Sequence, residues 1–218
     1  EVIAQDIPID IVYEDSVVLV VNKPAGMVVH PGHGNYSGTL VNALAWHMRN
    51  IPDYDVNDPR MGLVHRIDKD TSGLLVVAKT PDAKTNLGRQ FFNKTTKRQY
   101  VALVWGIPQP MQGTVATNIG RSLRDRLQMD TFPLDGDMGK RAVTHYSVEE
   151  TMNYVSLVKC VLETGRTHQI RVHMKSIGHP LFADARYGGD QILRGLRTQK
   201  YSRFVANCHD ICPRQALH

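Results

Sequence analysis

A polar segment with several chemically active side chains lies between two apolar runs: it reads His65-Arg66-Ile67-Asp68-Lys69-Asp70-Thr71-Ser72-Gly73. Two basic residues, Arg66 and Lys69, flank Asp68, and nearby positive charge favours the ionised form of a carboxylate. An ionised carboxylate that neighbouring strands hold in place can act as a nucleophile or a general base. Asp, Ser and Gly are also the residues of ordinary turns. From local chemistry alone, a plain turn and a catalytic carboxylate both remain open.

Two classes of enzyme fit this segment poorly. In the catalytic loop of protein kinases Asp directly follows Arg, whereas Ile67 separates Arg66 from Asp68. No Gly-rich phosphate loop follows a strand in the sequence either, so a kinase is excluded. A glycosidase needs two carboxylates on either side of the bond that it cleaves. Asp68 and Asp70 are two residues apart in a turn, and this spacing does not require them to face one space.

The elements that must position Asp68 are predicted from apolar patterns and turn residues. Short apolar runs predict strands at 17–21, 27–29, 63–64, 74–78, 100–105, 142–148 and 154–162. The last two are expected to form an antiparallel hairpin that turns near Met152-Asn153. Helices are predicted over 39–48 and from Pro81 onward, where Thr80 is the natural N-cap. Hairpins mixed with separate helices indicate an α+β fold around a largely antiparallel, mixed sheet flanked by helices and loops.

A third helix is predicted over 167–177, with Thr167 as its cap and Gly178 and Pro180 at its end. The helical spacing places Ile170, Met174 and Ile177 on one face. The same spacing gathers three polar residues on the opposite face: His168, Arg171 and Lys175. Beyond Leu181 the chain is rich in Gly, Arg and Lys, and the pattern predicts little regular structure there.

Composition limits the classes of function without selecting one. The chain has 218 residues, with 26 Lys and Arg against 21 Asp and Glu, and a formal net charge of +5. This mild excess permits a partner that bears phosphates but does not require one. Basic residues cluster at Lys94, Lys97 and Arg98, at Arg121, Arg124 and Arg126, and at Lys140 and Arg141, and each cluster alone is typical of a solvated surface.

The sequence shows no membrane, export or metal signal. It has no run of about 20 apolar residues, no charged-then-apolar leader and no Gly/Ser-rich linker, so one cytoplasmic domain over 1–218 is expected. The three cysteines are too few for a disulfide framework. Cys208 and Cys212 are four residues apart with His209 between them, but the second half of a metal site is missing. Reduced structural thiols are therefore expected.

Several motifs in one order resemble the RluA/RluD-type RNA pseudouridine synthases. The segment from Gly62 to Leu74, which includes His65-Arg66-Ile67-Asp68, is similar to the family signature. Further similar segments are Asn22-Lys23-Pro24-Ala25-Gly26 with His30-Pro31-Gly32, Arg98-Gln99-Tyr100-Val101-Ala102, Gly165-Arg166-Thr167-His168-Gln169-Ile170-Arg171-Val172-His173, and His179-Pro180-Leu181 with Tyr187-Gly188-Gly189. They run from about residue 10 to the end, and together they are far more specific than any one alone.

The resemblance implies an isomerase that converts uridine in RNA to pseudouridine without a cofactor or metal. It implies that Asp68 is the essential carboxylate, that Tyr100 stacks on the target uracil, and that Arg171 pairs with Asp68. Whether the carboxylate attacks the sugar, attacks the base or removes the C2′ proton stays open. Five residues are implied or expected to contact the RNA or the extruded nucleotide: Arg66, Lys69, Arg166, His168 and Lys23.

The branch that the sequence resembles most is the RluD branch, which implies large-subunit ribosomal RNA as the substrate. A monomer is expected. A transfer-RNA target is the alternative within the enzyme class. A non-catalytic RNA-binding or ribosome-assembly module is the alternative outside it. Many relatives carry an N-terminal RNA-binding domain, whereas this chain begins at the catalytic region, so either that domain is expected to be absent or the chain is a fragment. The strands that follow the end of this chain in relatives are also expected to be missing, which would leave an exposed sheet edge.

Overall fold

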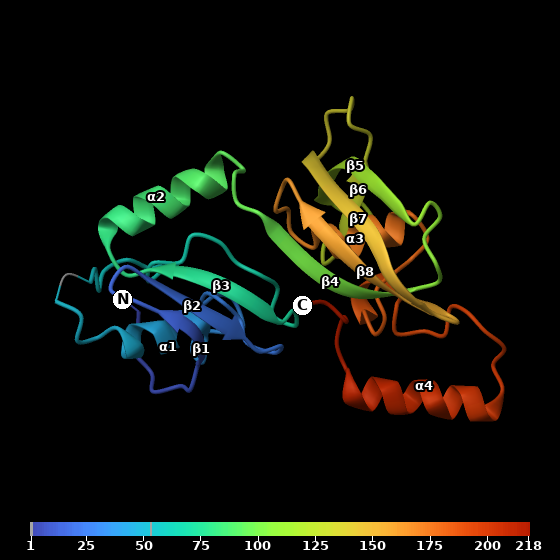
Figure 1. Ribbon diagram of the computed structural model, residues 1–218, viewed down its shortest axis with the longest axis horizontal. Helices are drawn as coiled ribbons and strands as arrows, with labels where there is room; N and C mark the ends of the chain where they lie inside the picture. Colours follow the sequence, from blue (N-terminus) through green and yellow to red (C-terminus); the bar gives the residue numbers. More distant parts are fainter. Residues whose placement is uncertain (1, 53) are drawn as a thin grey trace. The chain divides into compact units, whose positions relative to one another are not determined.

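The computed structural model describes residues 2–52 and 54–218, which form two compact units divided between Thr96 and Lys97. The first unit contains a three-stranded antiparallel sheet in the order β1 (Asp10–Glu14), β2 (Val18–Lys23) and β3 (Gly73–Ala78). Two helices accompany it, α1 (Leu40–His47) and α2 (Pro81–Phe92) (Figure 1). Its core joins the inward residues of the strands to those of α1, namely Leu19, Val21, Leu75, Val77, Leu40 and Leu44.

The helix starts of the first unit follow the sequence signals. Thr39 precedes α1 and forms a reciprocal cap with Asn42, as the Thr39 N–H donates to Asn42 Oδ1 (3.0 Å). Thr80 precedes α2 and its hydroxyl accepts from the Ala83 N–H (3.2 Å). Such caps satisfy N–H groups that the first helical turn leaves unpaired. Both predicted starts are confirmed.

Two of the predicted strands in the first unit are wrong. Residues 27–29 are not a strand, because the Val28 and Val29 carbonyls accept from the N-terminal N–H groups of α1. Residues 63–64 form only a single bridge, between Leu63 and Val77. In both cases the backbone groups that a strand would use are engaged elsewhere. The short strand β1, with a mostly exposed face, was not predicted.

The second unit contains a five-stranded antiparallel sheet in the order β4-β8-β7-β5-β6 (Figure 1). The strands are β4 (Arg98–Trp105), β5 (Gln112–Arg121), β6 (Met129–Phe132), β7 (Lys140–Met152) and β8 (Val155–Leu162). The β7–β8 hairpin and its turn are confirmed. The remaining elements are α3 (Gln169–Ser176), a short 3₁₀ helix η1 (Ala185–Tyr187) and α4 (Gln199–Ile211). Strands β5 and β6 and helix α4 were not predicted.

The outer edge of β4 is covered by two other segments of the chain. The Val101 N–H donates to the His218 carbonyl (2.8 Å), and the Leu103 N–H donates to the Ala216 carbonyl (3.0 Å). Farther along, the Trp105 N–H donates to the Pro180 carbonyl (2.9 Å). The bare edge that the sequence suggested is therefore not found along β4, because these segments occupy its hydrogen-bonding groups.

Helix α3 differs from its prediction at the start. It begins at Gln169, and the preceding His168 has a left-handed backbone (φ 56°) without a side-chain cap, so the predicted Thr167 cap is wrong. The apolar face is confirmed, since Ile170, Met174 and Ile177 belong to one core cluster. Arg171 lies on the face predicted to be polar, yet it is only 6% exposed.

None of the helices described is both long enough and apolar enough to cross a bilayer.

Candidate active site

Asp68 lies in a loop of the first unit, residues 62–73, that starts and ends on β3. This segment is called the Asp68 loop below. At its start the Ala78 N–H donates to the Gly62 carbonyl (2.9 Å). At its end Gly73 is the first residue of β3. One end of the loop is therefore hydrogen-bonded to β3 and the other continues into it, and the half-buried Asp68 lies between them.

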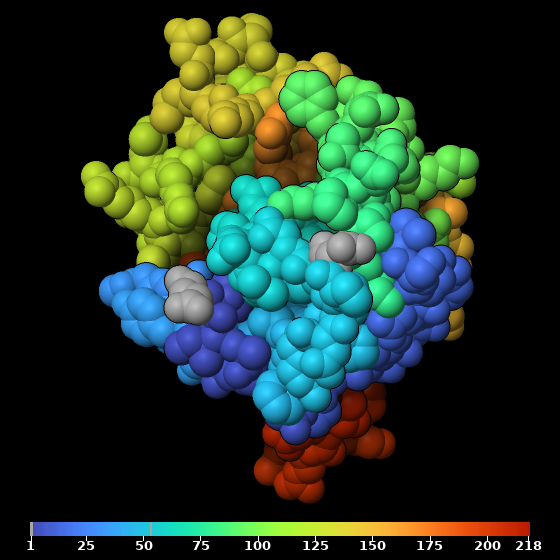
Figure 2. All heavy atoms as spheres, turned by 90° about the vertical axis from the view of Figure 1, so that its left-hand side faces the viewer, coloured from blue at the N-terminus to red at the C-terminus, as the bar shows by residue number. Residues whose placement is uncertain are grey.

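Gly62 is required at the start of this loop. It has a φ of 81°, in the left-handed region that side chains disfavour. A Cβ at this position would also collide with the carbonyl oxygen of Ala78. The residues just before this point, in cyan, face the viewer near the centre of Figure 2.

Lys23 holds the other side of the Asp68 loop. Its side chain is 1% exposed, and its ammonium donates to the carbonyls of Pro24 (2.8 Å), Met27 (2.8 Å) and Lys69 (2.9 Å). Three carbonyls thus match the three N–H donors of an ammonium. Because Lys69 directly follows Asp68, Lys23 fixes the backbone beside the carboxylate. Its direct contact with RNA stays a prediction, one that this burial disfavours.

His65 and Asp58 support the loop from two further sides. His65 Nε2 accepts from the Val76 N–H (3.0 Å), and its ring stacks on Phe91 of α2 with centroids 4.5 Å apart. The buried Asp58 carboxylate accepts from the Gly62 N–H (3.0 Å) and from Lys84 Nζ (2.7 Å). Burial raises the pKa of Asp58, but the hydrogen bonds from Lys84 and the backbone outweigh it and lower the pKa overall.

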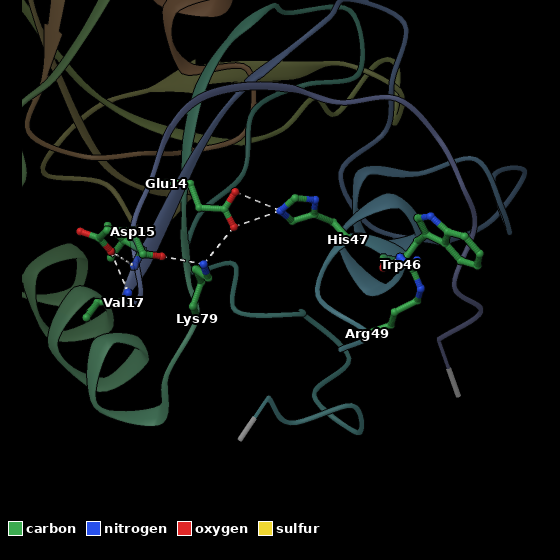
Figure 3. Close-up of polar contacts among 8 residues, drawn as sticks. Glu14, Asp15, Val17, Trp46, His47, Arg49 and Lys79 are labelled. Atoms are coloured by element: carbon green, nitrogen blue, oxygen red, sulfur yellow. Dashed lines mark hydrogen bonds and ion pairs between the residues drawn. The ribbon is translucent and has the colours of Figure 1, made fainter. Parts of the chain in front are cut away.

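A separate polar cluster ties together three elements of the first unit (Figure 3). The Glu14 carboxylate contacts His47 Nε2 (3.0 Å) at the end of α1 and accepts from Lys79 Nζ (2.9 Å), just after β3. Burial raises the pKa of Glu14, and the bonds from Lys79 and His47 lower it by more. These contacts join strands and helix, which is a structural role.

Tyr100 and Arg171 belong to the second unit. Tyr100 lies in β4 opposite Cys160 of β8 and packs against the core cluster of this sheet. Arg171 lies in α3, and its guanidinium donates from Nε to Asp184 Oδ2 (2.8 Å) and from Nη2 to Asp184 Oδ1 (3.0 Å). Asp184 is 1% exposed, so the pair is buried. The expected pairing of Arg171 with Asp68, which would join the two units, stays a prediction.

An aromatic ring lies against the same guanidinium. The Arg171 Cζ atom lies over the Tyr187 ring, 5.0 Å from its centroid, a cation–π arrangement. The Tyr187 hydroxyl accepts from the Met129 N–H (2.9 Å) and bonds to His168 Nδ1 (2.6 Å). The ring is 2% exposed. Arg171 is thus held along one edge by Asp184 and on one face by Tyr187.

The turn before α3 is fixed to the sheet by a buried amide. Gln169 Nε2 donates to the Val143 carbonyl (3.0 Å) and to the Thr144 hydroxyl (2.9 Å) of β7. Gln169 Oε1 accepts from the Thr164 hydroxyl (2.7 Å) and from the Arg166 N–H (3.0 Å). This network sets where α3 starts, and hence where Arg171 lies.

The remaining predicted RNA contacts differ in exposure. Arg66 and Lys69 are exposed, and Arg166 donates through Nε to the Arg141 carbonyl (2.8 Å). His168 is half-buried and bonded to Tyr187. Most residues of the predicted basic clusters are exposed, whereas Arg98 donates to the Glu163 carbonyl (3.3 Å). Contact with RNA stays a prediction for all of them.

The described residues contain neither a disulfide bond nor a cluster of metal ligands. Cys160, Cys208 and Cys212 are free thiols, and burial raises the pKa of Cys160 to about 12. Across residues 2–52 and 54–218, no group of three or more His, Cys, Asp or Glu side chains is arranged to hold a metal ion.

Comparison with known proteins decides the family. Residues 17–176 match the profile described as RNA pseudouridylate synthase, a span that contains Asp68, Tyr100 and Arg171. The chain belongs to this family. The resemblance to RluA/RluD-type pseudouridine synthases is thereby confirmed.

Curated relatives of this pseudouridine synthase chain are about half identical to it. The ribosomal large subunit pseudouridine synthase D of Zymomonas mobilis is 50% identical over 214 residues, which cover 96% of this chain and 67% of the relative. An uncharacterised RNA pseudouridine synthase of Chlorobaculum parvum is 48% identical over 219 residues, 100% of this chain and 67% of the relative. For other relatives the chain spans as little as 54% of their length.

Solved structures confirm the α+β fold of the pseudouridine synthase chain. Human RNA Pseudouridylate Synthase Domain Containing 4 matches with a TM-score of 0.72 at 24% identity, over 96% of this chain and 81% of its own. Human RNA Pseudouridylate Synthase Domain Containing 1 matches with a TM-score of 0.67 at 29% identity, over 86% and 74%.

The sequence analysis missed two supports of the candidate site, Asp184 and Asp58. Asp184 lies between two segments already recognised as similar to the family, and this position was the available signal. Asp58 had no motif to mark it. Only the fold brings its carboxylate to the start of the Asp68 loop.

Proposed function

We propose that this chain converts uridine to pseudouridine in large-subunit ribosomal RNA, as a cytoplasmic monomer. The family match over residues 17–176 carries the proposal, together with relatives that bear the name ribosomal large subunit pseudouridine synthase D. In this reaction the bond from C1′ to N1 breaks and a bond from C1′ to C5 forms. A proton leaves C5 and N1 gains one, so the product is an isomer of the substrate.

Asp68 is the catalytic carboxylate in this proposal. Breaking the glycosidic bond builds charge on both the sugar and the base, and a fixed carboxylate near C1′ can stabilise or capture the sugar. Correct placement of such a group can lower a barrier by about 7–11 kcal/mol in favourable cases. The anchoring of the Asp68 loop to β3 and Lys23 supports this role, because it restrains the backbone on both sides of the carboxylate.

Tyr100 and Arg171 complete the proposed site. A base that leaves an RNA helix loses its stacked neighbours, and an aromatic ring such as Tyr100 can replace them. Arg171 pairs with Asp68 in the RNA-bound enzyme and keeps its carboxylate ionised and oriented. Arg66 and Lys69 contact the extruded nucleotide or its phosphates.

Replacement of Asp68 by Asn tests the proposal. The change keeps the size of the side chain, so Asp68→Asn is expected to abolish product while leaving RNA binding mostly intact. Pseudouridine is measured under single-turnover conditions by carbodiimide labelling and reverse transcription, with unmodified large-subunit ribosomal RNA. Asp70→Asn, in the same loop, is the matched control and is expected to turn over normally.

Each outcome of this experiment separates the alternatives. Substantial turnover by Asp68→Asn contradicts the role of Asp68. If the chain forms pseudouridine in a transfer-RNA pool and none in ribosomal RNA, its substrate is transfer RNA instead of ribosomal RNA. RNA binding without product from the unaltered chain indicates a non-catalytic binding module.

A further inference from the structure

Arg171 has a second carboxylate neighbour whose geometry is restrictive. Asp184 accepts from Nε and Nη2 of Arg171 at 2.8 and 3.0 Å, so it covers one edge of the guanidinium with two parallel bonds. Two-point pairing of this kind fixes the plane of the guanidinium as well as its position. Both partners are buried, at 6% and 1% exposure. The edge of the guanidinium that Asp184 binds is therefore the one formed by Nε and Nη2.

We propose that Asp184 is a positioning residue: it fixes the guanidinium of Arg171 in the orientation that lets its other edge engage Asp68 when RNA is bound. The inference rests on the proposed function and adds to it a residue that acts through Arg171 and does not touch the substrate. Asp184 therefore affects the rate of the chemical step far more than RNA affinity.

The backbone around Asp184 is built to hold one position. The Ala183 N–H donates to the Gly189 carbonyl (2.9 Å), and the Gly189 N–H donates back to the Asp184 carbonyl (2.8 Å). The indole N–H of Trp105 also donates to the Gly189 carbonyl (2.7 Å), which ties the loop to β4. Each of these bonds limits how far the Asp184 carboxylate can shift.

Two backbone features show how tightly this loop closes. Gly189 leaves no room for a side chain, because a Cβ would collide with the Leu181 carbonyl oxygen. Ala183, next to Asp184, has a left-handed backbone (φ 62°), a conformation that is unfavourable for a non-glycine residue. Strain of this kind persists only where the surroundings over-determine it, and it is enriched at functional sites.

Stability alone does not explain the pair. A buried ion pair is in general no more stabilising than well-packed apolar residues of the same volume. The arrangement does fix the orientation of the Arg171 guanidinium, since Asp184 binds one edge of it and the Tyr187 ring lies against one face. A fixed direction matters for chemistry, where a misplacement of about 1 Å can cost roughly 100-fold in rate.

The test compares Asp184→Asn, Arg171→Lys and the double variant in single-turnover assays on large-subunit ribosomal RNA. Asp184→Asn is expected to lower the single-turnover rate about 10- to 100-fold. Its RNA dissociation constant is expected to stay within about twofold of the original. Lysine cannot make the two-point pair, so in the Arg171→Lys background the same change is expected to add less than about twofold. Glu163→Gln, which loses a partly exposed carboxylate beside His145, is the control and is expected to react normally.

Two results overturn the inference: a full rate for Asp184→Asn, or a loss that multiplies with that of Arg171→Lys. If Asp184→Asn does not fold, Asp184→Glu is the second variant, because it keeps the charge but moves it by one methylene. The inference then requires a slower rate at unchanged RNA affinity, and a full rate rejects it. An unaltered chain that makes no pseudouridine refutes the proposed function instead, so the two failures are distinguishable.

Discussion

The Asp68 loop and the surroundings of Arg171 hold their central residues in different ways. In the first unit the supports reach the backbone: Lys23 binds carbonyls, and the ends of the loop bond to β3. In the second unit the supports reach the side chain itself, through Asp184 and the ring of Tyr187. The contrast indicates that the short side chain of Asp68 is positioned by fixing the backbone of its loop. The long side chain of Arg171 instead needs contacts to the guanidinium itself.

The two units also bury ionisable groups differently. Lys23 can stay charged in the interior because three carbonyl dipoles solvate its ammonium. His173 is fully buried between the hydroxyls of Thr117 (2.9 Å) and Thr144 (2.8 Å), which do not neutralise a positive charge. Burial accordingly lowers the pKa of His173 to about 4. His173 is therefore predicted to make stability depend on pH.

The largest effect is expected from Lys23→Met. The change leaves three buried carbonyls without their donor, and each such loss costs about 1–3 kcal/mol. We expect a loss of at least about 3 kcal/mol in the free energy of unfolding, measured by urea denaturation. Lys200→Met, on the exposed face of α4, is the control and should stay within about 0.5 kcal/mol. If Lys23→Met and Lys200→Met are equally stable, the hydrogen bonds from Lys23 to the backbone do not distinguish the first unit.

His173 is expected to make the chain less stable in mild acid. Its folded pKa of about 4 lies below the ordinary value of 6.5, so the unfolded chain takes up a proton first as the pH falls. The stabilisation is complete above pH 6.5 and is lost as the pH falls toward 4. At about 1.4 kcal/mol for each pH unit, the loss is roughly 3 kcal/mol.

Urea denaturation between pH 4 and 7 checks this prediction. The slope of unfolding free energy against pH should decrease by close to one proton in His173→Asn. An unchanged slope would show that His173 does not titrate in this window and would weaken the comparison with Lys23.

A smaller effect is expected from Phe91→Ala. Phe91 is half-buried and stacks on His65, which in turn bonds to β3, so its loss should cost about 2 kcal/mol, less than a fully buried Phe. The neighbouring Phe92 is 85% exposed, and Phe92→Ala should cost less than about 0.5 kcal/mol. Thermal unfolding of the two variants measures the difference. A cost at Phe92 as large as that at Phe91 would show that the stack does not support the loop.

Sequence patterns predicted the strongly patterned parts of the fold. The caps at Thr39 and Thr80 and the β7–β8 hairpin were correct because their signals are local. Strand β5 was missed because polar and glycine residues interrupt its apolar pattern. Helix α4 does carry helical spacing, with Tyr201, Val205 and Cys208 at one core cluster, but few of its residues are apolar and only Val205 is buried. The assignment of residues 27–29 failed for another reason, since whether an apolar run pairs with a strand or with a helix end depends on distant residues.

The central residues of the candidate site were selected from the sequence, whereas the residues that hold them in position were not. Asp68, Tyr100 and Arg171 could be selected because the motifs that contain them resemble a family. The burial of Arg171 was not foreseen, because helical spacing alone placed it with His168 and Lys175 on a polar face. A buried arginine requires a carboxylate, and the partner, Asp184, is fixed by a loop whose closure depends on tertiary contacts.

The close approach of Gly189 to the Leu181 carbonyl also allows a prediction about related sequences. Any larger residue at that position would force the loop open and displace the carboxylate that it carries. A related sequence with another residue there is therefore expected to hold its arginine less firmly, even if its aspartate, tyrosine and arginine are all intact. One glycine can thus help to separate active relatives from those that keep the fold without the turnover.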